Sequence, residues 1–171
     1  YLPELNYRTG QIPLLALLTH TSGLPAIPAL HSFFADSSRL DRNLAFERLF
    51  SIEPEFAIGE HVIYSCTGYI ILGVLLERIS GMLLGELFQK EIAAPLKLVQ
   101  ASFAKNIQKS GEPKPLDNAV ATEYCPWRNR RIQGQVHDES SYCLGGHSGN
   151  AGLFLSLKDA ITLGNFIMQE G

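Results

Sequence analysis

Two short segments carry side chains that could take part in acyl-transfer or acid–base chemistry. Tyr64 and Cys66 stand at the start of an apolar stretch, and His137, Asp138 and Glu139 follow one another directly. A free tyrosine titrates near about pH 10, so it needs a nearby cation to act as a base near neutral pH. A nucleophilic Cys66 would need a histidine and an acid beside it, and the sequence shows no such arrangement. Adjacent side chains point in different directions, so the His-Asp-Glu run is not expected to hold a metal ion.

Four segments in a fixed order carry a resemblance to a known family. They are Leu17-Leu-Thr-His-Thr-Ser-Gly-Leu-Pro25, Tyr64-Ser-Cys-Thr-Gly-Tyr69, Val136-His-Asp-Glu-Ser-Ser-Tyr142 and Gly145-Gly-His-Ser-Gly-Asn-Ala-Gly-Leu-Phe154. Together they closely resemble the serine β-lactamases of class C type, the penicillin-binding proteins and the β-lactamase-related esterases. The resemblance covers nearly all of residues 10–171, although any one segment alone would be weak.

The resemblance implies a mixed α/β fold for the parent protein, with an antiparallel sheet flanked by helices and a mainly helical subdomain. Residues 1–171 are expected to be a single partial domain, namely that helical subdomain, with long loops and few short strands. Residues 105–147 are rich in Asn, Pro, Gly, Lys and Arg, and are expected to form a long loop region near the active-site cleft. Without its sheet, the chain would leave apolar surface uncovered, which favours self-association or pairing with another piece of chain.

The resemblance also implies an acyl-enzyme serine hydrolase that acts on β-lactam, peptide or ester bonds. The family uses a Ser-x-x-Lys motif, a Tyr-x-Asn motif and a Lys- or His-Thr/Ser-Gly motif, and Tyr64 matches the catalytic tyrosine of the second. A serine attacks only when a base removes its proton. That serine is expected upstream of Leu17, outside this chain, and the third motif is expected after residue 171. The chain alone is therefore expected to be inactive.

Cys66, His137 and Asp138 are the expected substrate-binding residues. Cys66 stands where β-lactamases carry Asn, and a thiol replaces an amide poorly as a hydrogen-bonding group. This departure favours an esterase-like or peptidase-like site over a β-lactam site. It also leaves open a non-catalytic family member that binds peptidoglycan or a protein partner. The family position of His137 and Asp138 indicates the rim of the cleft.

Literal copies of the first and third motifs occur at Ser102-Phe-Ala-Lys105 and His147-Ser-Gly149. Both are rejected because their order in the chain differs from the order in the family. Ser102 falls where the family has a structural turn, and His147 falls in a glycine-rich turn that precedes the last helix. His20 is expected to hydrogen-bond backbone groups and hold its turn rather than to act as a base.

The elements that must position these residues are predicted from apolar periodicity and helix-breaking residues. The strongest predicted helix spans 67–80 and is expected to be mostly buried, with Ser65 or Thr67 as its cap and Gly81 after its last turn. Ser156 and Asp159 have the spacing of a capping box. The other predicted helices span 12–18, 41–50, 84–92 and 156–169, and short strands are predicted near 119–123 and 131–136.

Composition excludes several classes of function. The 171 residues carry a net charge of −3 and are 46% apolar, which suits one domain with a real core. The basic residues form no stripe, so no nucleic-acid partner is expected. The cluster of Arg128, Arg130 and Arg131 beside Trp127 is interpreted as a solvated or ion-paired loop. No apolar run reaches the length of about 20 residues that a membrane span requires.

The cysteines predict neither a zinc site nor a redox motif, because Cys66, Cys125 and Cys143 form no Cys-x-x-Cys pair. They are interpreted as free thiols, with a Cys125–Cys143 disulfide as the alternative. A small-molecule or peptide substrate is expected, without a cofactor. The compartment stays open, because the family points to the cell envelope whereas unpaired cysteines fit a reducing interior.

Overall fold

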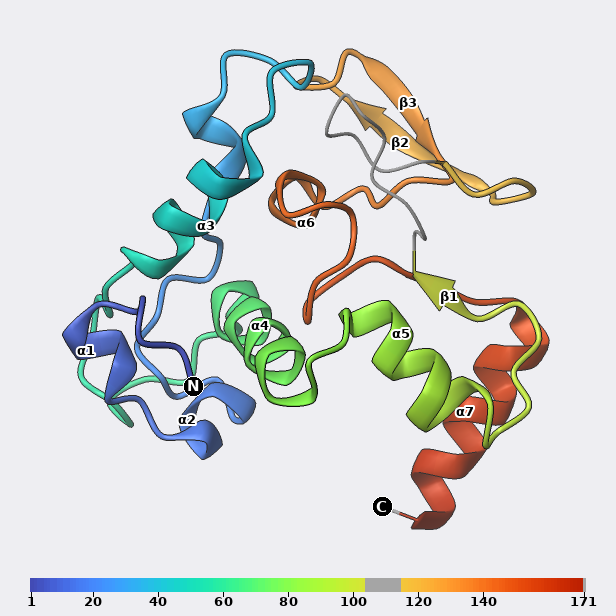
Figure 1. Ribbon diagram of the computed structural model, residues 1–171, viewed down its shortest axis with the longest axis horizontal. Helices are drawn as coiled ribbons and strands as arrows, with labels where there is room; N and C mark the ends of the chain where they lie inside the picture. The colour runs from blue at the N-terminus through green and yellow to red at the C-terminus, as the bar shows by residue number, and fades with distance from the viewer. Residues whose placement is uncertain (104–114, 171) are drawn as a thin grey trace.

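The computed structural model describes residues 1–103 and 115–170, and these residues are mainly helical (Figure 1). Lys105 of the Ser102–Lys105 pattern lies outside them. The helices are α1 (Tyr7–Gly10), α2 (Leu14–Leu18), the 3-10 helix η1 (Leu30–Phe33), α3 (Arg42–Phe50), α4 (Cys66–Ser80), α5 (Leu84–Phe88), the π-helix η2 (Gln89–Ala93), α6 (Glu139–Cys143) and α7 (Leu157–Glu170). The strands are β1 (Ser102–Phe103), β2 (Ala121–Cys125), β3 (Arg130–Gln133) and β4 (Leu153–Phe154). The predicted combination of helices with few short strands is confirmed.

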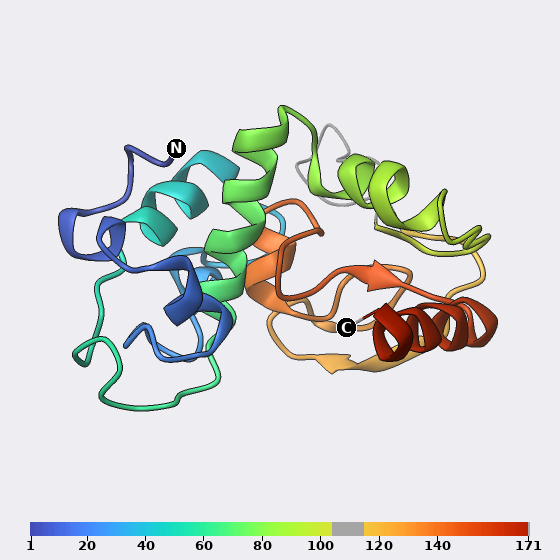
Figure 2. The same ribbon diagram turned by 90° about the horizontal axis from the view of Figure 1, so that it is seen from below.

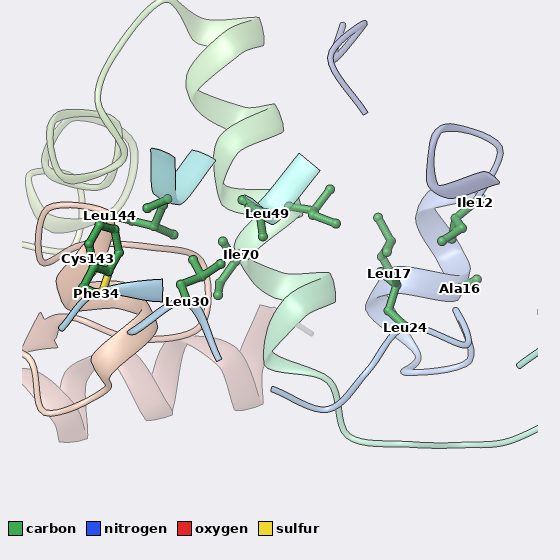
Figure 3. Close-up of a cluster of buried hydrophobic side chains, with 12 residues drawn as sticks. Ile12, Ala16, Leu17, Leu24, Leu30, Phe34, Leu49, Ile70, Cys143 and Leu144 are labelled. Atoms are coloured by element: carbon green, nitrogen blue, oxygen red, sulfur yellow. The ribbon is translucent and has the colours of Figure 1, made fainter. Parts of the chain in front are cut away.

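Helix α4 runs through the middle of the molecule, with α1, α2 and α3 on one side and α5 and α7 on the other (Figure 1, Figure 2). Its predicted limits are confirmed within one residue. The Ser65 hydroxyl caps its start by accepting a hydrogen bond from the Gly68 N–H, and Gly81 ends it with a left-handed φ of 68°. Buried apolar side chains lie on both sides of α4 (Figure 3). They include Ile12, Ala16, Leu17, Leu24, Leu30, Phe34, Leu49, Ile70, Cys143 and Leu144.

The prediction that α4 is mostly buried is correct only for its first half. Ile70 and Ile71 are buried, whereas Leu76 and Ile79 are 47% and 54% exposed. The difference arises because the core gathers around the first turns of the helix, and its last turns extend beyond that core. The apolar side chains at 76 and 79 therefore add to the uncovered apolar surface of the chain.

The other predicted helices are present with shifted ends. Helix α2 begins two residues later than predicted because Pro13 has an extended ψ of 145° and precedes the first helical residue. Helix α3 begins after Asp41, whose carboxylate accepts hydrogen bonds from the N–H groups of Asn43 and Leu44. The predicted helix over 84–92 is α5, which continues into the π-helical turn η2.

The described part of residues 105–147 contains both of the short strands predicted there and a helix, α6, that was not predicted. Strands β2 and β3 form an antiparallel hairpin close to the predicted strands. Helix α6 follows the hairpin, and its five residues are too few to produce a recognisable apolar period. Strands β1 and β4 also pair antiparallel, with Ser102 opposite Phe154.

Helix α7 begins at the predicted capping residues. The Ser156 hydroxyl accepts a hydrogen bond from the Asp159 N–H at 3.1 Å. The Asp159 carboxylate bonds the Ser156 side chain in return, and it also accepts the N–H groups of Val99 at 3.1 Å and Gln100 at 2.6 Å. Burial raises the pKa of Asp159, but these hydrogen bonds outweigh it and lower the pKa overall. Asp159 therefore ties α7 to the loop before β1.

The three cysteines are free thiols, as the leading interpretation expected, and the alternative Cys125–Cys143 disulfide is wrong. Cys125 and Cys143 are buried in the interior. Burial raises the pKa of the Cys143 thiol to about 12, although the nearby Arg128 guanidinium opposes this rise. Cys143 therefore stays protonated and packs as an apolar group.

Helices α2 and α7 each expose several apolar side chains. The most exposed on these two helices are Leu14, Leu15, Leu18, Leu157, Ile161, Ile167 and Met168. Along the part of the chain that the structure describes, no helix combines the length and apolarity needed to cross a membrane.

The glycine-rich loop before β4 packs its backbone directly against α4, as the sequence predicted for a tight turn. Gly145, Gly146 and Gly152 have positive φ angles of 108°, 90° and 111°. A Cβ atom on Gly149 would lie 1.9 Å from the Tyr69 carbonyl oxygen and 2.9 Å from the Gly73 nitrogen. Only glycine allows the loop to approach the helix this closely.

This close approach predicts the effect of a single methyl group. Gly149→Ala is expected to lower the free energy of unfolding by about 3 kcal/mol, because the new Cβ overlaps helix backbone that cannot move aside. Gly164→Ala is the matched control, because a Cβ there meets nothing within 4 Å on α7. The control is expected to be neutral or to stabilise by about 0.5–1 kcal/mol. Urea denaturation measures both, and equal stability of the two variants would contradict the proposed packing.

Candidate active site

The segment that leads into α4 is held by the turn around His20, which runs beside it. The Glu55 N–H donates to the Gly23 carbonyl at 2.8 Å, and the Ile63 N–H donates to the His20 carbonyl at 2.9 Å. Gly23 has a φ of 74°, and a Cβ there would lie 2.2 Å from the Phe56 carbonyl oxygen. The chain therefore reaches residue 63 along a fixed path.

The His20 side chain fixes the residue that caps α4. Its Nδ1 accepts a hydrogen bond from the Ser65 N–H at 3.0 Å. The Ser65 hydroxyl donates to the Pro25 carbonyl at 2.8 Å and accepts from the Gly68 N–H at 3.1 Å. This contact confirms the prediction that His20 bonds backbone groups and holds the turn. The φ angle of His20 is 59°, which is uncommon for residues other than glycine. With this backbone conformation the ring points toward the start of α4.

Tyr64 therefore has a fixed backbone and a free side chain. It is 70% exposed, and its ring centroid lies 4.7 Å from that of His20. The His20 ring also stacks on Tyr69, with ring centroids 5.0 Å apart. Within the described residues, the Tyr64 hydroxyl makes no hydrogen bond and the side chain takes part in no ion pair or cation–π contact. The hydroxyl is available to a substrate or to another part of the protein.

Cys66 is the first residue of α4 and is half-buried. Its backbone N–H donates to the Ala26 carbonyl at 2.8 Å, so the position of the residue is fixed by the same turn region. Cys66 and Tyr64 are thus neighbours at the start of one helix. The structure places the proposed catalytic residue and one proposed substrate-binding residue together.

His137 and Asp138 lie between β3 and α6, and their side chains take different directions. His137 Nδ1 lies 2.8 Å from the Thr122 hydroxyl on β2. The Asp138 carboxylate caps α6 by accepting the Ser141 N–H at 2.6 Å, while Glu139 accepts a hydrogen bond from the Cys125 thiol at 3.5 Å. In the described part of the chain, no group of three metal-ligating side chains comes together. The Asp138 side chain thus caps α6, and His137 lines a cavity.

One short segment links these two groups of residues. The Ala26 carbonyl accepts the Cys66 N–H, and four residues later the Leu30 N–H donates to the Ser140 hydroxyl at 3.3 Å. The start of α4 and the start of α6 are therefore connected through residues 26–30. Through this connection, the segments that carry Tyr64 and His137 are fixed relative to each other, although the two side chains are not in contact.

A cavity of about 720 Å³ lies beside His137. Its volume is in the range of small-molecule sites. Thr122 and Gln135 add polar groups to its wall, whereas Val136 and Leu153 add apolar ones. Polar and apolar residues contribute about equally to this wall, which suits an organic substrate with polar groups.

The two rejected motifs differ in their surroundings. Ser102 begins β1 rather than a helix, and it also lines the cavity beside His137. The His147 side chain is only 7% exposed, and its Nε2 lies 3.7 Å from a Glu77 carboxylate oxygen. Burial lowers the pKa of His147, and the Glu77 carboxylate opposes this shift. His147 is thus an interior residue.

Arg128 is the residue whose environment the sequence did not predict. The sequence predicts a solvated or ion-paired loop for Arg128, Arg130 and Arg131. In the structure Arg130 and Arg131 are exposed, but Arg128 is buried, with only 5% of its surface exposed. Its guanidinium donates to the Val136 carbonyl at 2.8 Å and to the His137 carbonyl. The only signal in the sequence was its position beside Trp127, between two short strands.

Comparisons with known proteins agree with this geometry. The family model described as Beta-lactamase matches residues 1–169. The N-acetylmuramyl-L-alanine amidase of Bacillus subtilis (strain 168) is 28% identical over 194 residues, which cover 100% of this chain and 43% of the relative. This chain thus spans less than half the length of that curated relative.

Two solved structures share the fold. The penicillin binding protein from Bacillus halodurans has a TM-score of 0.62 at 18% identity, over 98% of this chain and 52% of that one. The D-amino acid amidase from Ochrobactrum anthropi SV3, complexed with D-phenylalanine, has a TM-score of 0.60 at 19% identity, over 98% of this chain and 47% of that one. The resemblance predicted from four sequence segments is confirmed. Because the family model matches almost its whole length, this chain belongs to the Beta-lactamase family.

Proposed function

We propose that this chain is the helical part of an acyl-enzyme serine hydrolase, in which Tyr64 transfers the proton of a serine located outside residues 1–171. The observation that supports this most is the free Tyr64 hydroxyl on a backbone held by His20 and Ser65. A proton-transfer group works best when its position is fixed before the substrate arrives. Its exposed hydroxyl can be reached by another part of the protein.

The proposed reaction needs a positive charge near Tyr64. A phenol becomes a base near neutral pH only when a cation stabilises its anion. By the family resemblance, the lysine of the Ser-x-x-Lys motif supplies that charge. Tyr64 then takes the serine proton while the serine oxygen bonds to the substrate carbonyl carbon. The bond to the leaving amine or alcohol breaks, the proton passes to that group, and water hydrolyses the acyl-enzyme.

The substrate is proposed to be a peptide-like amide or an ester. Two relatives are named as amidases, one for N-acetylmuramyl-L-alanine and one for D-amino acids. In this chain, the cavity beside His137 has room for such a molecule. His137 is proposed to contact the substrate, Cys66 to line the site near Tyr64, and Asp138 to support the rim as the cap of α6.

A second candidate function is binding without catalysis, of peptidoglycan or a protein partner. Cys66 favours this candidate because it replaces the amide of the family motif by a thiol. The exposed apolar side chains of α2 and α7 also leave room for self-association or for another piece of chain. The two candidates differ in one observable property, which is the formation of a serine adduct.

Treatment of the full-length gene product with a fluorescent penicillin and a fluorescent fluorophosphonate tests the proposal. A covalent serine adduct is expected with at least one probe. Tyr64→Phe is expected to slow its formation by about 100-fold or more, because it removes the proton-transfer group. Tyr69→Phe is the matched control, because Tyr69 stacks on the same His20 ring but bonds the Leu18 carbonyl. Absence of any adduct on the wild-type protein would support the binding candidate instead.

The role of Cys66 predicts a gain of reactivity toward β-lactams. Cys66→Asn is expected to speed acylation by the fluorescent penicillin about tenfold, which corresponds to one additional hydrogen bond of about 1.4 kcal/mol. Cys66→Ser is the control for size and polarity without an amide, and it is expected to change the rate little. Equal rates for the Asn and Ser variants would show that the side chain at 66 does not contact the β-lactam.

A further inference from the structure

Arg128 is a charged side chain enclosed by the protein, and it is held by four contacts. Its Nη1 donates to the Val136 carbonyl at 2.8 Å, and its Nη2 donates to the His137 carbonyl. Its Nε lies 3.3 Å from the Cys125 sulfur, and its guanidinium carbon lies 4.6 Å above the centre of the Tyr142 ring. Among the described residues, no carboxylate lies within ion-pair distance of it. Backbone carbonyls and an aromatic face thus replace the water that the charge gave up.

These contacts come from three parts of the chain. Cys125 ends β2, Tyr142 lies on α6, and Val136 and His137 form the link between β3 and that helix. A guanidinium has donors in a rigid fork, so two carbonyls bonded to it are fixed relative to each other. The backbone of His137 therefore cannot rotate without breaking a charge-assisted hydrogen bond in the interior.

The consequence concerns the cavity of about 720 Å³ that His137 lines. The His137 ring is held by the Thr122 hydroxyl, which lies 2.8 Å from its Nδ1 atom. Arg128 and Thr122 thus hold the backbone and the ring of the same residue. Arg128 itself does not line this cavity, so any effect on a bound molecule must pass through His137.

We propose that Arg128 is a positioning residue that sets the affinity for substrate by fixing His137 at the rim of this cavity. The inference rests on the proposed function. It predicts an effect on binding rather than on chemistry, because none of the contacts of Arg128 reaches the segment before α4 that carries Tyr64. A purely structural role would lower stability without changing affinity.

The test uses the full-length gene product and whichever of the two fluorescent probes labels it. Arg128→Lys keeps the charge but loses the fork, and Arg128→Met also removes the charge. The probe concentration for half-maximal labelling rate is expected to rise about threefold for Lys and about tenfold for Met, with the limiting rate unchanged within about twofold. Arg131→Met, an exposed position on the same hairpin, is expected to change neither value.

A double-mutant cycle shows whether the effect passes through His137. In a His137→Ala background, Arg128→Lys is expected to add no further change in half-saturation. Hydrogen exchange of residues 134–140, which needs no activity, is expected to accelerate in both Arg128 variants but not in Arg131→Met. Unchanged half-saturation in an active Arg128→Lys enzyme, or an equal effect in the His137→Ala background, overturns the inference and leaves the proposed function intact. No serine adduct on the wild-type protein overturns both.

Discussion

The hydrogen bond from the Ser65 N–H to His20 Nδ1 is the interaction on which the candidate site depends. Ser65 follows Tyr64 directly and caps α4. Its hydroxyl also donates a hydrogen bond to the Pro25 carbonyl. A buried backbone N–H without a partner would cost free energy, so the histidine satisfies a requirement that water cannot meet there. His20 in turn keeps its position because the N–H of Ile63, in the segment before Tyr64, donates to the His20 carbonyl. The result is a tyrosine whose backbone is fixed while its hydroxyl stays free.

Further contacts connect the segment that carries Tyr64 with the part of the site that contains His137. Core side chains pack on both sides of α4 (Figure 3). The backbone of Gly149 also approaches this helix directly. Residues 26–30 connect the start of α4 with α6, and Arg128 connects α6 with the link that carries His137. The proton-transfer group and the proposed substrate contact are therefore supported by separate interactions within one core. Variants that disturb the support of Tyr64 are therefore expected to change the rate of proton transfer. Variants that disturb the support of His137 are expected to change substrate binding.

Local signals predicted much of this fold, whereas contacts distant in sequence did not. Ser65 and Gly81 delimit α4 because capping depends on neighbouring residues. Asp159 has the spacing of a capping-box acid, but that spacing does not show that its carboxylate also accepts the N–H groups of Val99 and Gln100, about 60 residues earlier. Arg128 resembled its exposed neighbours because nothing local shows that carbonyls from 136 and 137 enclose it. Tyr64 was found only because four segments matched a family in order.

The central claim is that His20 serves as a structural acceptor for the helix that presents Tyr64. Nitrogen NMR of the neutral His20 ring tests it most directly, because a ring nitrogen that accepts a hydrogen bond cannot carry the proton. The account predicts a proton on Nε2, an unprotonated Nδ1, and a through-hydrogen-bond coupling between Nδ1 and the Ser65 amide nitrogen. A proton on Nδ1, with no coupling to Ser65, would contradict it.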